Sequence, residues 1–194
     1  MKYRNLGNSG LKVSAIGLGT NQFGGKVDEA TTKEIIHKGL DLGVTFIDTA
    51  NMYQKGNSEI AIGKAVKGIR DEVLIATKFF FPQGEGVNNR GGSRFHIIDA
   101  VEASLKRLDM DHIDLYQMHR WDEDTPIEET MRALDVLVKS GKVRYIGASN
   151  FSSWQLAHAN AVAKEIGVEK FVSIQPHWQM FERDIETELV PSTR

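Results

Sequence analysis

Short apolar runs alternate with amphipathic stretches along most of the chain. The apolar runs have β-forming composition and lie at about 14–19, 44–48, 73–77, 113–118, 143–147 and 171–175. The amphipathic stretches lie at about 28–42, 57–68, 94–108, 127–139, 153–166 and 182–190. Strands that alternate with helices are typical of a parallel sheet. The pattern therefore predicts six strand-helix units.

Polar residues that favour helix N-termini stand at the start of several amphipathic stretches. These candidate caps are Asp28, Asn57, Ser93, Thr125 and Ser152. In the stretch 127–139, the apolar residues recur at helical spacing and share one face: Ile127, Met131, Leu134, Leu137 and Val138. This stripe predicts a helix that packs that face against the core.

Two segments fall outside the repeating pattern. Residues 2–13 contain two β-like pieces on either side of the turn-forming sequence Gly7 to Gly10, which predicts a small hairpin. The segment 79–92 is rich in Gly and Asn and follows a predicted strand. Long loops in compact domains are usually functional or mobile, so we interpret this segment as a substrate-side loop, with a flexible surface excursion as the alternative.

The number of units suggests the fold class. A closed (β/α)8 barrel needs eight strand-helix units, typically in about 250 residues. We expect an α/β fold of the TIM-barrel type with about six units present, in a single domain over residues 1–194. A parallel arc of six strands would leave two unpaired edges. We therefore expect either that more chain exists or that something else covers those edges.

Composition and charge narrow the classes of function. The chain is 41% apolar and 26% charged, as is ordinary for one globular domain, and its net charge of −2 gives no footprint for nucleic acid. It contains no cysteine, and its polar N-terminal sequence lacks the apolar core of a signal peptide. No stretch approaches the roughly 18 apolar residues of a membrane span. We expect a cytoplasmic protein that binds neither nucleic acid nor membranes.

Metal binding finds little support in the sequence. The six histidines are scattered, without an H-x-H or HExxH pair. The acidic segment 109–114 lacks the glycine and terminal glutamate of a calcium loop, so a solvated loop before a strand is the better interpretation. We expect no metal site.

Four polar residues stand at or just past the ends of predicted strands: Asp48, Tyr53, Lys78 and His119. The carboxyl ends of parallel strands in one barrel meet at one mouth, so all four are expected to converge there. Taken singly, each residue has an ordinary alternative. Asp48 could cap a turn, and Tyr53 could be an aromatic residue at the rim. Lys78 could be a partly buried lysine that needs a carboxylate, and His119 could be a core histidine.

Together the four residues point to the reduction of carbonyl groups. A tyrosine with an ordinary pKa of about 10 can protonate a carbonyl oxygen more readily if a neighbouring ammonium lowers that pKa. We expect Lys78 to favour the phenolate of Tyr53, and Asp48 to keep Lys78 charged and oriented. His119 could donate a hydrogen bond to the substrate oxygen.

Several separated motifs, in order, also resemble one known family. FIDTANMY, IATK and LYQMHR are similar to the segments that carry the catalytic tetrad of the aldo-keto reductase superfamily, and GASNF and SIQP are similar to its cofactor segments. The resemblance runs from about Leu6 to the end of the chain. It implies a hairpin that closes the bottom of the barrel, Asp48, Tyr53, Lys78 and His119 as catalytic residues, and an NADP(H) cofactor.

The resemblance also assigns cofactor-binding residues. It places Ser149 and Asn150 on the nicotinamide carboxamide with Gln175 as their partner, and Gly19 and Thr20 near the nicotinamide ribose, with Asp48 sharing that contact. For Ser149 and Asn150, capping of the following helix is the alternative. The glycines around Gly19 do not form a Rossmann fingerprint, because the third glycine position of G-x-G-x-x-G is Gln22.

Loop residues that neighbour the tetrad are candidates for a substrate pocket: Asn51, Met52, Phe79, Phe80 and Trp121. Packing between loops is the alternative for each. The predicted function is an NADPH-dependent oxidoreductase that reduces aldehydes or ketones to alcohols with a tyrosine acid. The alternatives are a nucleotide-binding regulatory subunit and an inactive truncated copy of the same fold. The natural substrate and the oligomeric state do not follow from the sequence.

Overall fold

Six parallel strands form the centre of the computed structural model, which describes residues 1–193. They pair in the order in which they follow one another along the chain: β3 (Gly17–Gly19), β4 (Phe46–Asp48), β5 (Leu74–Phe79), β6 (Ile113–Met118), β7 (Val143–Ser149) and β8 (Ser173–Gln175). Sequential parallel pairing with outer helices is the topology of a (β/α) barrel. The predicted partial barrel is therefore confirmed.

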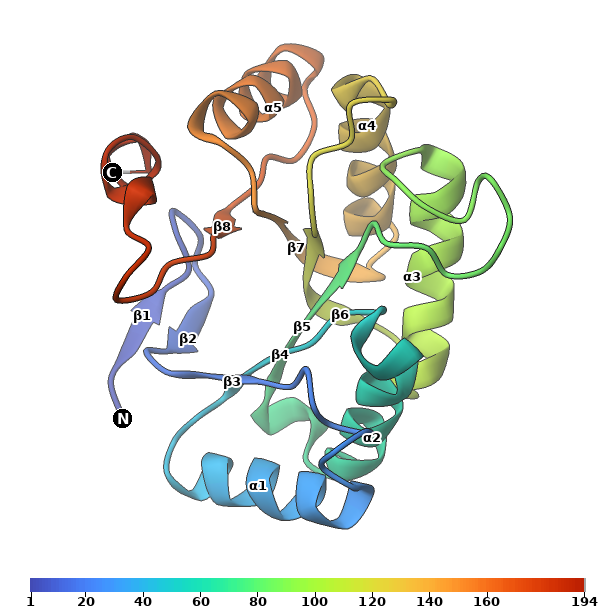
Figure 1. Cartoon of the computed structure of the whole chain (residues 1–194), viewed down its shortest axis with the longest axis vertical. Helices are drawn as coiled ribbons and strands as arrows, with labels where there is room; N and C mark the ends of the chain where they lie inside the picture. The colour runs from blue at the N-terminus through green and yellow to red at the C-terminus, as the bar shows by residue number, and fades with distance from the viewer. Residues whose placement is uncertain (194) are drawn as a thin grey trace.

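Helices follow the strands and cover the outside of the sheet. They are α1 (Glu29–Asp41), α2 (Asn57–Ala65), α3 (Arg94–Leu108), α4 (Ile127–Lys139) and α5 (Ser153–Ile166). Figure 1 shows these helices arranged around the outer side of the curled strand arc, whose open side faces the N-terminal hairpin and the C-terminal segment. The three predicted helices 94–108, 127–139 and 153–166 match α3, α4 and α5.

The predicted helix caps are partly confirmed. Asp28 and Ser93 accept hydrogen bonds from the backbone amides of the following turns, and Ser152 forms a capping box at the start of α5. Asn57 and Thr125 are not caps, because the cap positions are occupied by Gly56 and Pro126. The Thr125 hydroxyl donates instead to Asp122.

The predicted helix at 182–190 is wrong. The chain there forms the 3-10 turn η3 (Asp184–Glu186) and the short helix α6 (Leu189–Ser192). Pro191 lies in the first turn of α6, where the missing N–H of a proline is tolerated. Two further 3-10 segments, η1 (Tyr53–Gly56) and η2 (Arg70–Glu72), lie before and after α2.

The predicted N-terminal hairpin is confirmed and joins the amino ends of the strands. β1 (Tyr3–Asn5) pairs antiparallel with β2 (Lys12–Ser14). The Ser14 hydroxyl accepts hydrogen bonds from the backbone amides of Thr45 and Phe46, at the start of β4. At the hairpin turn, Gly7 has a φ of +53°, and a Cβ added there would lie 2.0 Å from the carbonyl oxygen of Val172. Only glycine allows so close an approach.

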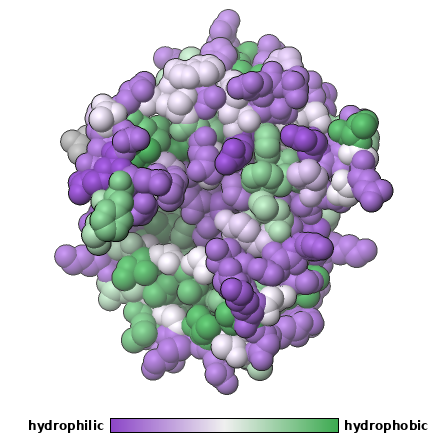
Figure 2. Space-filling view, in the orientation of Figure 1, coloured by the Kyte–Doolittle hydropathy of each residue, from purple (hydrophilic) through white to green (hydrophobic). Residues whose placement is uncertain are grey.

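The main hydrophobic core lies between the outer face of the sheet and the helices. It contains Ile75 of β5, Tyr116 of β6 and the stripe of α4, in which Ile127, Met131, Leu134 and Leu137 are buried. On the face drawn in Figure 2, hydrophilic residues cover most of the surface, and hydrophobic groups gather toward the lower left. None of the helices formed by residues 1–193 is long and apolar enough to cross a membrane.

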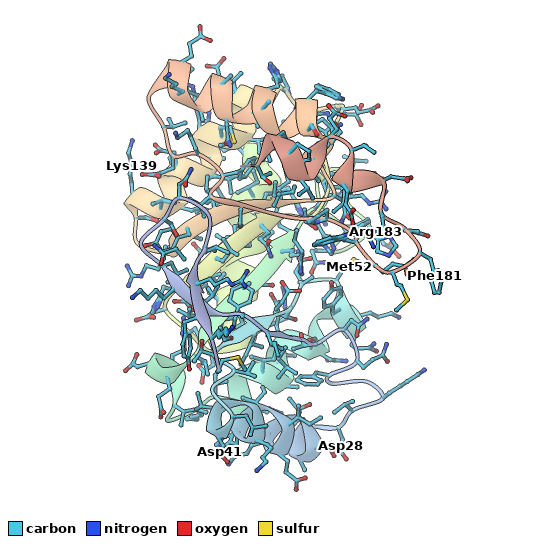
Figure 3. The ribbon with its side chains drawn as sticks, turned by 90° about the vertical axis from the view of Figure 1, so that its left-hand side faces the viewer. Asp28, Asp41, Met52, Lys139, Phe181 and Arg183 are labelled. Carbon is cyan, nitrogen blue, oxygen red and sulfur yellow. The ribbon has the colours of Figure 1, made fainter. Side chains whose placement is uncertain are left out.

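The two ends of the strands lie on opposite edges of the molecule. In Figure 3, Asp41 and Lys139, which end α1 and α4, lie at the left-hand side, whereas Asp28 and Met52 lie toward the right. Asp28 begins α1, and Met52 follows the carboxyl end of β4. The right-hand edge in that view is therefore the carboxyl edge of the sheet, where the active sites of barrel enzymes lie.

Candidate active site

The structure brings the four candidate catalytic residues together at the carboxyl edge. Asp48 ends β4, Lys78 lies near the end of β5, His119 follows β6, and Tyr53 begins η1. Lys78 binds Asp48, and its Nζ lies 5.2 Å from the centroid of the Tyr53 ring. The Tyr53 and His119 rings meet edge to face with centroids 6.0 Å apart. The predicted convergence is therefore present in the fold.

Lys78 is buried, and its ammonium group uses all of its donors within the protein. Only 1% of the residue is exposed. Its Nζ donates to Asp48 Oδ1 at 2.8 Å, to Asp48 Oδ2 at 2.7 Å and to the carbonyl oxygen of Thr49 at 2.8 Å. Burial lowers the pKa of Lys78, and the Asp48 carboxylate opposes that shift. No ammonium hydrogen remains for Tyr53 in this geometry.

The Asp48 carboxylate also accepts two amide donors. Gln117 donates to Oδ1 at 3.2 Å, and Gln175 donates to Oδ2 at 3.1 Å. Each carboxylate oxygen therefore accepts one bond from Lys78 and one from an amide. Sequence reasoning missed Gln117. Strand alternation could have indicated it, because Gln117 lies two positions before His119 and therefore points to the same side of the sheet as His119.

Tyr53 is protonated near neutral pH. Burial, with a further contribution from the Asp48 carboxylate, raises the pKa of Tyr53 to about 12. The expectation that Lys78 lowers this pKa is wrong for this structure. The physical reason is that the Lys78 ammonium is held by Asp48 and Thr49, so the phenol loses water without gaining a hydrogen bond from a cation.

His119 is neutral near pH 7. Burial, followed by the positive charges of Lys78 and Arg120, lowers the pKa of His119 to about 4. Its Nδ1 is buried without a hydrogen-bond partner among the described residues. A neutral imidazole has one N–H donor and one acceptor. His119 can therefore donate a hydrogen bond without carrying a charge into the site.

The backbone just after Tyr53 has an unusual left-handed conformation. Gln54 and Lys55 have φ values of 50° and 57°, and Gly56 follows with a φ of 92°. For residues other than glycine, this conformation costs about 1 kcal/mol or more each. The surrounding structure must therefore stabilise the turn that carries Tyr53.

The candidate cofactor residues are partly brought together. The Ser149 hydroxyl donates to the Gln175 carbonyl oxygen at 2.9 Å, and the backbone N–H of Asn150 donates to the same oxygen at 3.2 Å. The Asn150 side chain donates to the carbonyl oxygen of His119 at 3.2 Å. Ser149, Asn150 and Gln175 thus form one group that adjoins the tetrad.

Gly19 and Thr20 differ in how they face the site. Gly19 lies opposite Asp48 in the sheet, is exposed, and has no atom within 4 Å of the position of an added Cβ. Thr20 is 1% exposed, and its hydroxyl is engaged with the Asp48 carbonyl oxygen and with Ser58. Gly19 therefore borders open space, whereas the Thr20 hydroxyl is part of the protein interior.

Two of the candidate pocket residues are fully buried. Phe79 has no exposed surface and stacks on Tyr116 with centroids 4.8 Å apart, on the outer face of the sheet. Its prediction as a pocket residue is corrected, because strand alternation turns it away from Lys78. Asn51 also has no exposed surface, and both polar atoms of its side chain lack partners within residues 1–193.

The other candidates lie nearer the surface. Met52 is 38% exposed, and Figure 3 shows it at the same edge as Phe181 and Arg183 of the C-terminal segment. Phe80 is 9% exposed, and Trp121 is half-buried with its ring 5.3 Å from that of Phe151.

Phe81 was missed by sequence reasoning, although its ring meets that of His119 edge to face at 5.0 Å. Its position three residues after Lys78, in the expected substrate-side loop, was the available signal.

Two hollows in the described part of the surface lie away from the tetrad. One hollow lies beside Gly24, Gly25 and Asn57, and another beside Trp178 and Arg183. Neither is lined by a tetrad residue. Within residues 1–193, no group of three or more His, Cys, Asp or Glu side chains is arranged to hold a metal ion.

Sequential parallel strands, outer helices and a polar cluster at the carboxyl edge define the class of (β/α) barrel proteins. The model of the aldo/keto reductase family matches residues 15–194, and the chain belongs to that family.

Three relatives illustrate the family. The aldo-keto reductase YhdN of Bacillus subtilis is 43% identical over 98% of this chain and 58% of its own length. The uncharacterized oxidoreductase YrpG of the same organism is 43% identical over 100% of this chain and 63% of its own. A probable voltage-gated potassium channel subunit beta of Arabidopsis thaliana is 40% identical over 98% of this chain and 60% of its own length. The chain thus spans less than two thirds of the length of these relatives.

Proposed function

We propose that this protein is an oxidoreductase that reduces the carbonyl group of an aldehyde or ketone to an alcohol, with NADPH as its cofactor and Tyr53 as the proton donor. The observation that carries the proposal is the meeting of a protonated phenol, a neutral imidazole and a buried Lys78–Asp48 pair at the carboxyl edge of the sheet. Family membership and the names of the bacterial relatives support the same reaction class.

The residues at this edge fit a nicotinamide cofactor. Gly19 leaves open space beside Asp48, and the group of Ser149, Asn150 and Gln175 offers amide and hydroxyl groups next to His119. Amide side chains suit a carboxamide because each supplies a donor and an acceptor. The cofactor, when bound, supplies the hydride that goes to the carbonyl carbon.

Tyr53 donates its phenolic proton to the carbonyl oxygen, which becomes basic as the hydride reaches the carbon. An alkoxide is far more basic than a phenolate, so a phenol with a pKa of about 12 remains a competent acid for it. His119 orients the oxygen by donating its single N–H, and Lys78, paired with Asp48, lies beside the Tyr53 ring. Water then restores the proton to Tyr53.

We also propose that residues 1–194 form part of a single barrel domain that works on small carbonyl compounds in the cytoplasm. The continuous sequential sheet supports one domain. The half-buried Trp121, the exposed Met52 and the nearby Phe80 and Phe81 support a preference for apolar or aromatic substrates.

Replacement of the proton donor tests this function. In the full-length protein, Tyr53→Phe should lower kcat for NADPH oxidation with an aromatic aldehyde by about 10²-fold or more. NADPH affinity, measured by cofactor fluorescence, should stay nearly unchanged. Tyr3→Phe is the matched control, because Tyr3 is exposed in the hairpin. A Tyr53→Phe enzyme that kept most of its rate would show that another group is the acid.

A second candidate function is a nucleotide-binding regulatory subunit. It is favoured by the 40% identity to a relative that is named a probable potassium channel subunit beta. The two functions predict different results from the same assay. Firm NADPH binding without turnover of any of a panel of aldehydes and ketones would favour the regulatory role, and turnover that depends on Tyr53 would favour the enzyme.

A further inference from the structure

A buried carboxylate outside the tetrad connects three elements behind the site. Glu59, in the first turn of α2, has no exposed surface. Thr77 of β5 donates to Glu59 Oε1 at 2.6 Å, and Arg107 of α3 donates through Nε to Glu59 Oε2 at 2.7 Å. A buried charge is tolerated only when it is paired and hydrogen-bonded, and both Glu59 oxygens meet this requirement.

The residue before Glu59 connects the same turn of α2 to different strands. The Ser58 hydroxyl donates to the carbonyl oxygen of Thr20 at 2.8 Å and lies 2.9 Å from the hydroxyl of Thr49. Thr49 also receives a hydrogen bond from Lys78 on its carbonyl oxygen. Two consecutive residues therefore attach the start of α2 to the ends of β3 and β4 and to β5 and α3.

Arg107 also touches the turn that carries Tyr53. A Cβ added to Gly56 would lie 2.8 Å from Arg107 Cδ and 3.1 Å from its Nε, so the arginine side chain packs directly against this glycine. Gly56 ends the left-handed turn that begins at Gln54. A turn with so many residues in the left-handed region persists only where its surroundings hold it. The Arg107–Glu59 pair forms part of those surroundings.

We propose that Glu59 and Arg107 are positioning residues for the reaction proposed above, which hold the left-handed turn so that Tyr53 stays beside Lys78 and His119. Thr77 is the link to the strand that bears Lys78, since the two residues are adjacent and point to opposite faces of β5. Glu59, Arg107 and Thr77 thus set the distance between the Tyr53 phenol and the Lys78 ammonium. They act from the helix-covered side of the sheet and do not contact substrate.

Removal of the hydrogen bond between Thr77 and Glu59 tests the proposal in the full-length protein. Thr77→Val keeps the shape of the side chain and removes the hydroxyl that donates to Glu59. We expect kcat to fall about tenfold, because small displacements of a catalytic group are costly, while KM and the NADPH dissociation constant stay nearly unchanged. Thr77→Ser, which retains the hydroxyl, should restore kcat. Glu59→Gln, which loses the charge pair with Arg107, should have the same effect as Thr77→Val.

A matched control and a readout without turnover complete the experiment. Thr130 is also buried and bonded, to the Gly92 carbonyl oxygen, so Thr130→Val loses one hydrogen bond away from α2. Hydrogen exchange of the amides of residues 53–58 should be faster in Thr77→Val and Glu59→Gln, and unchanged in Thr130→Val.

The pKa of Tyr53 is a second readout. It is measured from tyrosinate absorbance, as the difference between each variant and the same variant with Tyr53→Phe added. In Thr77→Val and Glu59→Gln this pKa should fall toward 10, because the phenol gains contact with water.

Exchange and turnover separate the two proposals. If residues 53–58 exchange as in the wild type in both folded variants, the positioning role is overturned, whatever the enzyme does. If the wild type turns over no carbonyl compound, the proposed reaction fails, and faster exchange in the variants would still support the anchoring of the turn.

Discussion

The Asp48 carboxylate joins the candidate site across the sheet. It lies at the end of β4 and accepts hydrogen bonds from Lys78 of β5, Gln117 of β6 and Gln175 of β8. Charge-assisted hydrogen bonds of this kind are stronger than neutral ones. The arrangement therefore ties the end of β4 to β5, β6 and β8 through one carboxylate.

The neutral His119 has a consequence for stability at acid pH. Its folded-state pKa of about 4 lies below the ordinary value of 6.5, so the unfolded chain binds more protons between these values. The free energy of unfolding should therefore fall as the pH falls from about 6.5 to 4. His119→Gln should remove up to about 3 kcal/mol of this loss. Denaturant unfolding of the wild type and of His119→Gln across this pH range measures the two free energies of unfolding. If both fell equally with pH, the prediction would be contradicted.

The turn η1 and the helix α2 act as one unit at the next level of organisation. The turn holds Gln54 and Lys55 in the left-handed region, and α2 is attached through Ser58 and Glu59. The strain is local, and it is balanced by bonds to several strands. These bonds attach the turn that carries Tyr53, the proposed proton donor, to the sheet.

Relief of this strain should stabilise the protein. Lys55 is exposed and has a φ of 57°, which glycine adopts without steric cost. Lys55→Gly should raise the free energy of unfolding by up to about 1 kcal/mol. Lys67→Gly is the control, because Lys67 is also exposed but does not have a positive φ. Equal effects of the two substitutions in denaturant unfolding would show that the turn stores no strain.

For the molecule as a whole, the candidate site and the N-terminal hairpin lie at opposite edges of the sheet. The tetrad lies at the carboxyl edge, whereas the hairpin β1–β2 is attached at the amino end of β4 through Ser14. Figure 1 shows the hairpin on the open side of the strand arc. Loss of contacts at this edge should affect stability without changing the reaction.

Ser14 provides a test of this separation. Ser14→Ala would leave the amides of the half-buried residues Thr45 and Phe46 without this acceptor, and the loss of the two hydrogen bonds should lower the free energy of unfolding by about 1–3 kcal/mol. The kcat of the folded enzyme should not change. Ser192→Ala, which removes a local bond at an exposed helix end, should cost much less. A fall in kcat in Ser14→Ala at full folding would contradict the separation.

Much of the fold was predictable because the repeating units are local patterns. Helical spacing located α3, α4 and α5, with the caps Ser93 and Ser152 supporting α3 and α5, and the alternation of runs predicted the sequential parallel sheet. The C-terminal stretch 182–190 was mispredicted as one helix, because its amphipathic pattern does not show that η3 ends at Glu186 and α6 begins only at Leu189. Gly56 as a cap was missed because its left-handed conformation and its contact with Arg107 arise only in the folded chain.

The sequence by itself determined the strand order and the positions of the tetrad, because strand ends and their polar residues follow from a short-range pattern. Only the tertiary structure decided the charges and directions of these groups. The Tyr53 pKa rises instead of falling, because burial and then the Asp48 carboxylate raise it. Phe79 faces Tyr116 instead of the site. Desolvation and hydrogen bonding join residues far apart in the chain, and these contacts exist only once the strands have paired.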